Sequence, residues 1–152
     1  MTRIIGGVAG SLKLQAPAKT TRPTADRVRE SIFNRLESRD ALVGVRVLDL
    51  YAGTGALALE ALSRGAASAV LVEANGKAAA VCLANAKLVE KSLISNGADV
   101  AQPAARVVAK PVKNYLASAD GQFDLVFIDP PYELGNDELT ENLTALLPHL
   151  KS

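Results

Sequence analysis

From residue 45 onward, short apolar runs alternate with longer segments that repeat apolar residues at helical spacing. The apolar runs predict four strands, at 45–50, 69–73, 106–109 and 123–128. Helical spacing predicts four helices, over 56–64, about 77–89, 112–118 and from 136 onward, with a loop at 92–104. The last helix is expected to be capped by Asn136 or Asp137 and carries Leu139, Leu143, Leu146 and Leu147. This alternation predicts an α/β fold whose parallel sheet is covered on both faces.

The first 44 residues follow a different pattern. Apolar stretches within 3–14 are broken by glycines, which predicts a β-hairpin with a glycine-rich turn. A proline-containing loop at 15–23 follows, and Thr24 is expected to cap a helix over 25–38. On that helix Val28, Ile32 and Leu36 are spaced four apart and are expected to face a core. One domain, 1–152, is expected, with an extension at 1–44 in front of a core at 45–152.

Composition is that of a soluble globular protein. Hydrophobic residues make up 49% and charged residues 22% of the 152 positions, unlike a disordered chain. No apolar run approaches the roughly 18 residues of a membrane span, and the N-terminus lacks the apolar stretch of a secretion signal. The single cysteine, Cys82, cannot form an internal disulfide, so a cytoplasmic protein with a buried structural thiol is expected.

Charge is unevenly distributed along the chain. Residues 1–46 carry nine Lys and Arg against four Asp and Glu, whereas residues 47–152 carry eight against twelve. A basic leading segment on a mildly acidic body points to contact with a polyanion. On charge alone, an ordinary solvated helix is an equally good explanation.

A glycine-rich loop follows the first predicted strand. Gly53 and Gly55 allow a sharp turn and a close approach of a ligand to the backbone, just before a helix N-terminus. Glu73, 20 residues beyond Gly53, is placed where a ribose-binding acid is expected, so both NAD(H) and S-adenosylmethionine fit the pattern. Asp49 favours S-adenosylmethionine, because a carboxylate there can face the ammonium group of that cofactor but has no partner in a pyrophosphate.

The fourth predicted strand leads into Asp129, Pro130, Pro131 and Tyr132. Consecutive prolines stiffen the loop, which suits it to hold hydrogen-bond acceptors against a substrate. The Asp129 carboxylate and the Pro130 carbonyl can grip an aromatic amine and stabilise the positive charge that develops as a methyl group is transferred. Tyr132 offers a flat face to a base removed from its stack. Hydride transfer has no use for such a loop, so NAD(H) becomes the weaker of the two cofactor assignments.

With these motifs in order, the sequence resembles the RsmD family of bacterial enzymes that methylate the exocyclic N2 of a guanine in 16S ribosomal RNA. The resemblance rests on six segments: 3–7, 22–34, 48–57, 60–66 with the Leu-Ser-Arg-Gly-Ala helix end, Val72-Glu73 and 129–132. It implies a Rossmann-like class I methyltransferase fold and S-adenosylmethionine as the cofactor.

The resemblance also implies roles for individual residues. The implied cofactor-binding set is Asp49, Tyr51, Gly53, Thr54, Gly55 and Glu73. The implied RNA contacts come from the basic front of the chain, at Arg3, Arg22, Arg27 and Arg29. The implied partner is 16S rRNA or the small ribosomal subunit, and the chain is expected to be a monomer that uses neither a membrane nor a metal, since His149 is its only histidine and has no cysteine near it.

Two departures from the family pattern stand out. The family commonly has Gly-Asp-Ala after the third strand, whereas residues 108–112 here contain no acid. The family also continues into further strands after the last helix found here, so C-terminal strands are expected to be missing and one sheet edge to be exposed.

Two other functions stay open at this point. One is the same chemistry on a DNA adenine-N6 or a protein glutamine, although the glutamine enzymes usually carry Asn at position 129. The other is a non-catalytic RNA-binding module.

Overall fold

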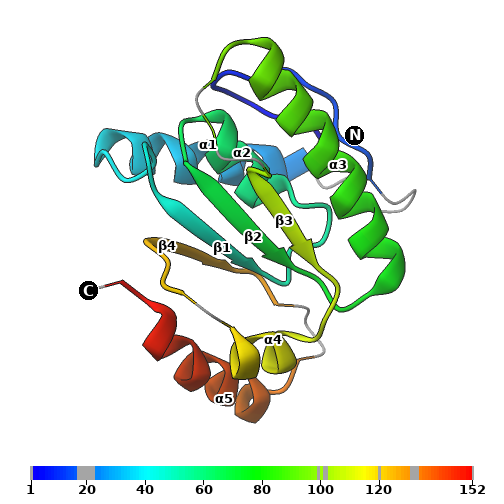
Figure 1. Ribbon diagram of the computed structural model, residues 1–152, viewed down its shortest axis with the longest axis vertical. Helices are drawn as coiled ribbons and strands as arrows, with labels where there is room; N and C mark the ends of the chain where they lie inside the picture. The colour runs from blue at the N-terminus through cyan, green and yellow to red at the C-terminus, as the bar shows by residue number, and fades with distance from the viewer. Residues whose placement is uncertain are drawn as a thin grey trace.

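The computed structural model describes residues 2–16, 23–98, 100, 103–119, 121–130 and 134–151. Strands and helices alternate along most of this length (Figure 1). The strands are β1 (Arg46–Leu50), β2 (Ser68–Val72), β3 (Ala105–Val108) and β4 (Leu125–Ile128). The helices are α1 (Pro23–Ser38), α2 (Ala56–Ser63), α3 (Gly76–Ser95), α4 (Val112–Ser118) and α5 (Asn136–Leu146), with a 3-10 turn at Leu147–His149.

The strands form one parallel sheet in the order β3-β2-β1-β4. The chain steps outward from β1 through β2 to β3 and then returns to the other side of β1 for β4. Leu50 lies opposite both Val72 and Ile128, so β1, β2 and β4 end at the same level. In open sheets of this kind ligands bind beyond the carboxyl ends of the strands, where the strand order reverses, which here is between β1 and β4.

Alternation along β1 sends side chains into two cores, one on each face of the sheet. Val47 packs with Phe33 in the core beneath α1, α2 and α3. Leu48 packs with Leu116 and Leu146 in the core beneath α4 and α5. Figure 1 shows the two groups of helices on opposite sides of the strands. The predicted α/β fold with both faces covered is therefore confirmed.

Most predicted boundaries are right to within one or two residues, but the end of one helix and the cap of another differ from the prediction. Helix α3 runs on to Ser95, so residues 92–95 are helical rather than part of a loop. Its stop is Gly97, which has a φ of +76°. Helix α5 has Gly135 as its N-cap, so Asn136 and Asp137 lie in its first turn and do not cap it.

The orientation of α1 differs from the prediction. The helix begins at Pro23, whose fixed φ and missing N–H suit a first helical position, so Thr24 lies inside it. Val28 and Ile32 are 58% and 41% exposed. The inward residues are Arg29 and Phe33, with exposed fractions of 6% and 0%. Leu36, the third residue of the predicted set, is half-buried and packs against the core as expected. The prediction is wrong for Val28 and Ile32, because Arg29 and Phe33 take the inward positions instead.

The extension in front of α1 is a compact loop rather than a two-stranded hairpin. Its only antiparallel bridge among the described residues joins Arg3 and Lys13. The Ile4 N–H donates to the Leu12 carbonyl at 2.9 Å, and the Leu14 N–H donates to the Thr2 carbonyl at 2.8 Å. The side chains of Ile4 and Leu14 are buried in the same core as Phe33.

Beyond β4, the last described residues begin to pair with the sheet. Phe123 and Leu150 form a parallel bridge, in which the Phe123 N–H donates to the His149 carbonyl at 2.7 Å. The Lys151 N–H in turn donates to the Phe123 carbonyl at 2.9 Å. Leu125–Ile128 itself has a strand partner only on the β1 side within the described part of the chain.

No described helix combines the length and the apolar character needed to cross a bilayer.

Candidate active site

The carboxyl ends of β1, β2 and β4 bring together the polar residues that the sequence singled out. Tyr51, Glu73 and Asp129 each follow the last residue of a strand, and those last residues lie opposite one another in the sheet. Asp49 lies one step back, inside β1. The predicted cofactor residues and the first catalytic residue therefore share one edge.

The loop after β1 is built from left-handed backbone. Tyr51, Gly53 and Gly55 have φ values of +61°, +60° and +86°. A Cβ at Gly55 would lie 3.0 Å from both the Cys82 sulfur and a Leu71 methyl, so the close packing of this loop requires glycine. A Cβ at Gly53 would meet no described atom within 4 Å. The loop is thus packed from beneath at Gly55 and open at Gly53, where a ligand can approach the backbone.

Glu73 holds this loop in place. One of its carboxylate oxygens accepts from the Gly53 N–H at 2.8 Å, and the other accepts from the Asn75 N–H at 2.9 Å. Asn75 in turn caps α3, since its side chain accepts from the N–H groups of Lys77 and Ala78. Each Glu73 oxygen has a second lone pair available for a hydroxyl donor.

Asp49 is almost completely buried, with 1% of its surface exposed. Its Oδ2 accepts from the Ala58 N–H at 3.2 Å, near the N-terminus of α2, while Oδ1 has no hydrogen-bond partner among the described residues. Burial raises the pKa of this carboxyl from 3.8 to about 7, and the charges of Asp129 and Glu73 add to the rise, against the Ala58 hydrogen bond. A buried carboxyl with a free oxygen is suited to receive a cationic group.

Asp129 is exposed and Pro130 is half-buried, directly after the end of β4. Pro131 and Tyr132 lie outside the described residues. On the β3 side, the Val108 carbonyl accepts from the N–H groups of Glu73 and Lys110, both at 3.1 Å, so backbone groups line the position where the family has an acid.

Two asparagines that the sequence patterns did not single out support the loop. Asn142 of α5 is 4% exposed and donates to the Tyr51 hydroxyl at 2.7 Å. Burial raises the pKa of that hydroxyl. Asn85 of α3 is fully buried and donates to the Thr54 carbonyl at 2.9 Å. Each asparagine is a polar residue on an otherwise apolar helix face. That pattern is the one feature of the sequence from which the two could have been identified.

The predicted RNA-contacting arginines divide into three cases. Arg3 and Arg27 are exposed and line the same surface hollow, of about 260 Å³. Arg29 is wrong as a surface contact, because its side chain is 7% exposed and lies between the carboxylates of Asp26 and Glu60. Arg22 lies outside the described residues.

Cys82 is buried and free, and burial raises the pKa of its thiol to about 12. Such a thiol stays protonated near neutral pH, in agreement with the predicted structural role. The described residues contain no cluster of three or more His, Cys, Asp or Glu side chains that could hold a metal ion.

Sequence comparisons give this geometry a context. A family model described as "Conserved hypothetical protein 95" matches residues 2–151. The "Ribosomal RNA small subunit methyltransferase D" of Escherichia coli K12 is 42% identical over 142 residues, which cover 93% of this chain and 65% of the relative. The relative of the same name from Haemophilus influenzae is 33% identical over 148 residues, with coverages of 95% and 69%. The chain thus spans about two thirds of the length of these relatives.

Solved structures agree with the sequence matches. A hypothetical protein from Thermus thermophilus superimposes with a TM-score of 0.74 at 34% identity, covering 100% of this chain and 81% of that one. An Escherichia coli protein provisionally assigned as a methyltransferase gives 0.72 at 38% identity, with coverages of 97% and 73%. These matches confirm the predicted Rossmann-like class I methyltransferase fold.

Proposed function

This chain belongs to the RsmD family, and from that premise we propose that it is a methyltransferase that uses S-adenosylmethionine to methylate ribosomal RNA. The observation that carries the proposal is the meeting of Asp49, Glu73 and Asp129 around the open glycine loop at one edge of the sheet. The chain spans 65% of the length of its Escherichia coli relative, and the proposed reaction needs only residues within that span.

The residues of this edge fit S-adenosylmethionine. The backbone at Gly53 faces open space, and the buried Asp49 has an unpartnered Oδ1 among the described residues. We assign Asp49 to the ammonium end of the cofactor, Glu73 to the ribose hydroxyls, and the 51–55 loop, including Tyr51 and Thr54, to the backbone approach. When bound, the cofactor supplies a methyl group activated by its positively charged sulfur.

On the substrate side, Asp129 and the Pro130 carbonyl act on an exocyclic amine. The lone pair of such an amine is delocalised into its ring, which makes it a poor nucleophile. By accepting the two amine hydrogens, Asp129 and Pro130 favour a tetrahedral nitrogen and stabilise the charge that develops on it. We also assign to Asp129 the acceptance of the released proton. Pro131 and Tyr132 are assigned to stiffening the loop and stacking on the base.

The target we propose is the N2 amine of a guanine in 16S rRNA, in the cytoplasm with the small ribosomal subunit as partner. Support comes from the similarity to the ribosomal RNA small subunit methyltransferases D of Escherichia coli and Haemophilus influenzae, and from the exposed cations Arg3 and Arg27 on the basic front segment. Phosphate contacts of this kind position a nucleic acid without reading its sequence.

The test supplies labelled S-adenosylmethionine and undermethylated 30S particles to this chain and maps the labelled base. We expect label on a guanine N2 in 16S rRNA. Asp129→Ala should reduce label at least about a hundredfold while affinity for S-adenosylhomocysteine is kept. Asp137→Asn, at the exposed start of α5, is the matched control and should leave the rate unchanged.

Other outcomes of the same assay decide against the proposal. Label in duplex DNA or in a release-factor-like protein, with none in 16S rRNA, would move the substrate to another class of amine. Full retention of every measured function by Asp129→Ala would instead favour a non-catalytic RNA-binding module.

A further inference from the structure

Glu60 is a buried charge in an apolar helix. Helix α2 has the sequence Ala-Leu-Ala-Leu-Glu-Ala-Leu-Ser, and Glu60 is its only charged residue, with an exposed fraction of 0%. The helix begins directly after Gly55, so it carries the cofactor loop at its N-terminus. A carboxylate in this position is unfavourable unless its oxygens are fully paired. Most of the groups that pair with it come from outside the helix.

The first set of partners belongs to the N-terminal extension. The N–H groups of Ile5 and Gly6 donate to the two oxygens of Glu60 at 2.8 and 2.9 Å. Close by on α2, the Ser63 hydroxyl donates to the Gly6 carbonyl at 2.6 Å and accepts from the Ala9 N–H at 2.9 Å. The backbone of residues 5–9 is therefore laid along α2 by side chains of that helix.

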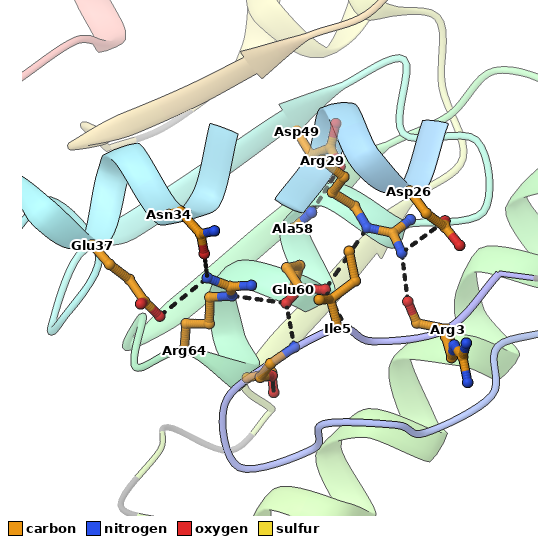
Figure 2. Close-up of polar contacts among 12 residues, drawn as sticks. Arg3, Ile5, Asp26, Arg29, Asn34, Glu37, Asp49, Ala58, Glu60 and Arg64 are labelled. Carbon is orange, nitrogen blue, oxygen red and sulfur yellow. Dashed lines mark hydrogen bonds and ion pairs between the residues drawn. The ribbon is translucent and has the colours of Figure 1, made fainter. Parts of the chain in front are cut away.

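The second set of partners consists of two arginines, drawn in Figure 2 on either side of Glu60. Arg64 Nε lies 2.8 Å from one Glu60 oxygen, and Arg29 Nε of α1 lies 3.8 Å from the other. The Arg29 Nη2 group also donates to the Arg3 carbonyl and, at 3.2 Å, to Asp26. One carboxylate thus joins the cofactor helix, α1 and the backbone of the extension.

Two exposed cations depend on this arrangement. Arg3 belongs to the extension and Arg27 to α1, and both line the surface hollow of about 260 Å³ that lies over their junction. Their side chains come from separate segments, which contact each other through the Arg29–Arg3 hydrogen bond and meet α2 at Glu60. The spacing of the two cations, and their placement relative to α2, therefore follow from the Glu60 contacts.

We propose that Glu60 is a positioning residue for RNA, which holds Arg3 and Arg27 in fixed register with the helix that carries the cofactor loop. The inference rests on the proposed function and deepens it. Glu60 touches neither RNA nor cofactor, and it acts through the backbone of residues 5–6 and through Arg29. It also gives a purpose to the Leu-Ser-Arg-Gly-Ala helix end, because Ser63 and Arg64 belong to the same set of contacts.

The experiment compares Glu60→Gln with the double variant Arg3→Gln/Arg27→Gln in the 30S methylation assay. Glutamine keeps the size of the side chain but places an amide N–H against groups that all donate. We expect KM for 30S particles to rise about tenfold or more, with kcat and the affinity for S-adenosylhomocysteine kept within about threefold. Adding Glu60→Gln to the double variant should raise KM little further, because the cations it positions are already gone.

A second variant separates positioning from stability. In Glu60→Gln/Arg29→Met the buried guanidinium that has lost its Glu60 partner is removed, so part of the lost Tm should return, while the hold on Arg3 stays lost and KM stays high. Glu37→Gln is the matched control. Glu37 pairs with Arg64 at 3.2 Å at the exposed end of the same network, and its loss should leave KM unchanged.

The possible results distinguish the positioning role of Glu60 from the proposed function. A normal KM in Glu60→Gln, or a KM that recovers together with Tm when Arg29→Met is added, would overturn the positioning role. Absence of methylation by the unaltered chain would overturn the proposed function alone. The positioning role would then be decided by the affinity of the same variants for 16S rRNA, with an unchanged affinity counting against it.

Discussion

At the scale of single residues, cofactor binding and folding favour opposite states of Asp49. The proposed ammonium partner favours the charged carboxylate, whereas burial favours the protonated carboxyl. The carboxyl is buried beneath the glycine loop, with one oxygen accepting from Ala58 and the other left over among the described residues. Burial raises its pKa from 3.8 to about 7. The folded protein therefore holds a proton that the unfolded chain has already lost across the pH range between those two values.

This proton linkage predicts how Asp49→Asn changes stability with pH. The stability attached to the protonated carboxyl is complete below about pH 4 and is lost as pH rises through about 7, because the charge must then be buried. Asparagine never ionises, so the variant should be more stable than the unaltered chain above pH 7, by up to about 4 kcal/mol. The gain should vanish below pH 4. Urea unfolding across this range measures it.

The same substitution should weaken binding of S-adenosylhomocysteine, since the assigned partner of the ammonium group has lost its charge. Asp137→Asn, exposed on α5, is the control for a change of net charge. A stability difference for Asp49→Asn that does not vary with pH would contradict the raised pKa.

Gly7 offers a second test at this scale. Its φ is +78°, and a Cβ there would lie 2.0 Å from the Ser63 carbonyl oxygen, which accepts from the Val8 N–H at 2.8 Å. Gly7→Ala should therefore lower the free energy of unfolding by at least about 2 kcal/mol, because strain is added to the loss of the docked backbone. Gly44 has a φ of +77° with nothing described within 4 Å, so Gly44→Ala should cost only about 1 kcal/mol. Equal costs in urea unfolding would mean that the extension does not depend on this close approach.

At the scale of elements, α3 joins the extension to the cofactor loop through Asn85. The Asn85 side chain accepts from the Gln15 N–H at 2.7 Å and donates to the Gln15 and Thr54 carbonyls, both at 2.9 Å. Every donor of this buried amide is used. The loop and the end of the extension are thus held by one side chain.

Asn85→Ala should loosen both elements at once. Leaving these backbone groups unpaired in a buried site costs about 1–3 kcal/mol each, so affinity for S-adenosylhomocysteine should fall about tenfold and the amide of Gln15 should exchange faster. Calorimetry and hydrogen exchange measure the two effects. Asn96→Ala is the control at the C-terminal end of the same helix, since Asn96 is exposed and its side chain donates to Ser92 within the last turn. Faster exchange at Gln15 with unchanged affinity would show that the loop does not need this support.

Elements were predictable where local pattern and packing agree. The sheet and the glycine loop were predictable because their signals are local. Apolar runs mark β1 and β2, and glycines mark the loop between β1 and α2. The orientation of α1 was not predictable, because Val28 and Ile32 lie at a regular apolar spacing on a side of the helix that no described element covers. The helix turns Phe33 into the core and Arg29 toward Asp26 and Glu60, and Glu60 is far from α1 in the chain.

The site divides in the same way. Asp49, Glu73 and Asp129 were predictable because each stands at a strand end of a parallel sheet, and such ends meet. Asn142, Asn85 and Glu60 were not singled out, since their partners are backbone groups and a hydroxyl on distant segments. Each is a polar residue on an apolar helix face. That pattern calls for a buried partner but does not say which one.

At the scale of the whole molecule, the structure shows where the basic residues at the front of the chain lie. Of the nine Lys and Arg in residues 1–46, Arg3 and Lys13 belong to the extension, and Arg27, Arg29 and Arg35 belong to α1. The extension and α1 both contact α2 at Glu60. Part of the excess positive charge is neutralised inside the protein, because Arg29 is buried between the carboxylates of Asp26 and Glu60. Arg3 and Arg27 are among the cations of this segment that remain exposed, together with Lys13, Arg35 and Arg39, and exposed cations can replace counterions on an RNA backbone.

The salt dependence of RNA binding should therefore reside in the front of the chain. Each phosphate contact that a cation makes steepens the fall of log affinity with log salt by about 0.7 to 0.9. Arg3→Gln/Arg27→Gln should reduce the magnitude of that slope by about 1 to 2, measured by filter binding of 16S rRNA over a series of salt concentrations. Lys87→Gln/Lys91→Gln removes the same net charge from exposed positions on α3 and should shift affinity without changing the slope as much. If the two pairs change the slope equally, RNA responds to the net charge of the molecule, and the docking of the extension on α2 serves the fold alone.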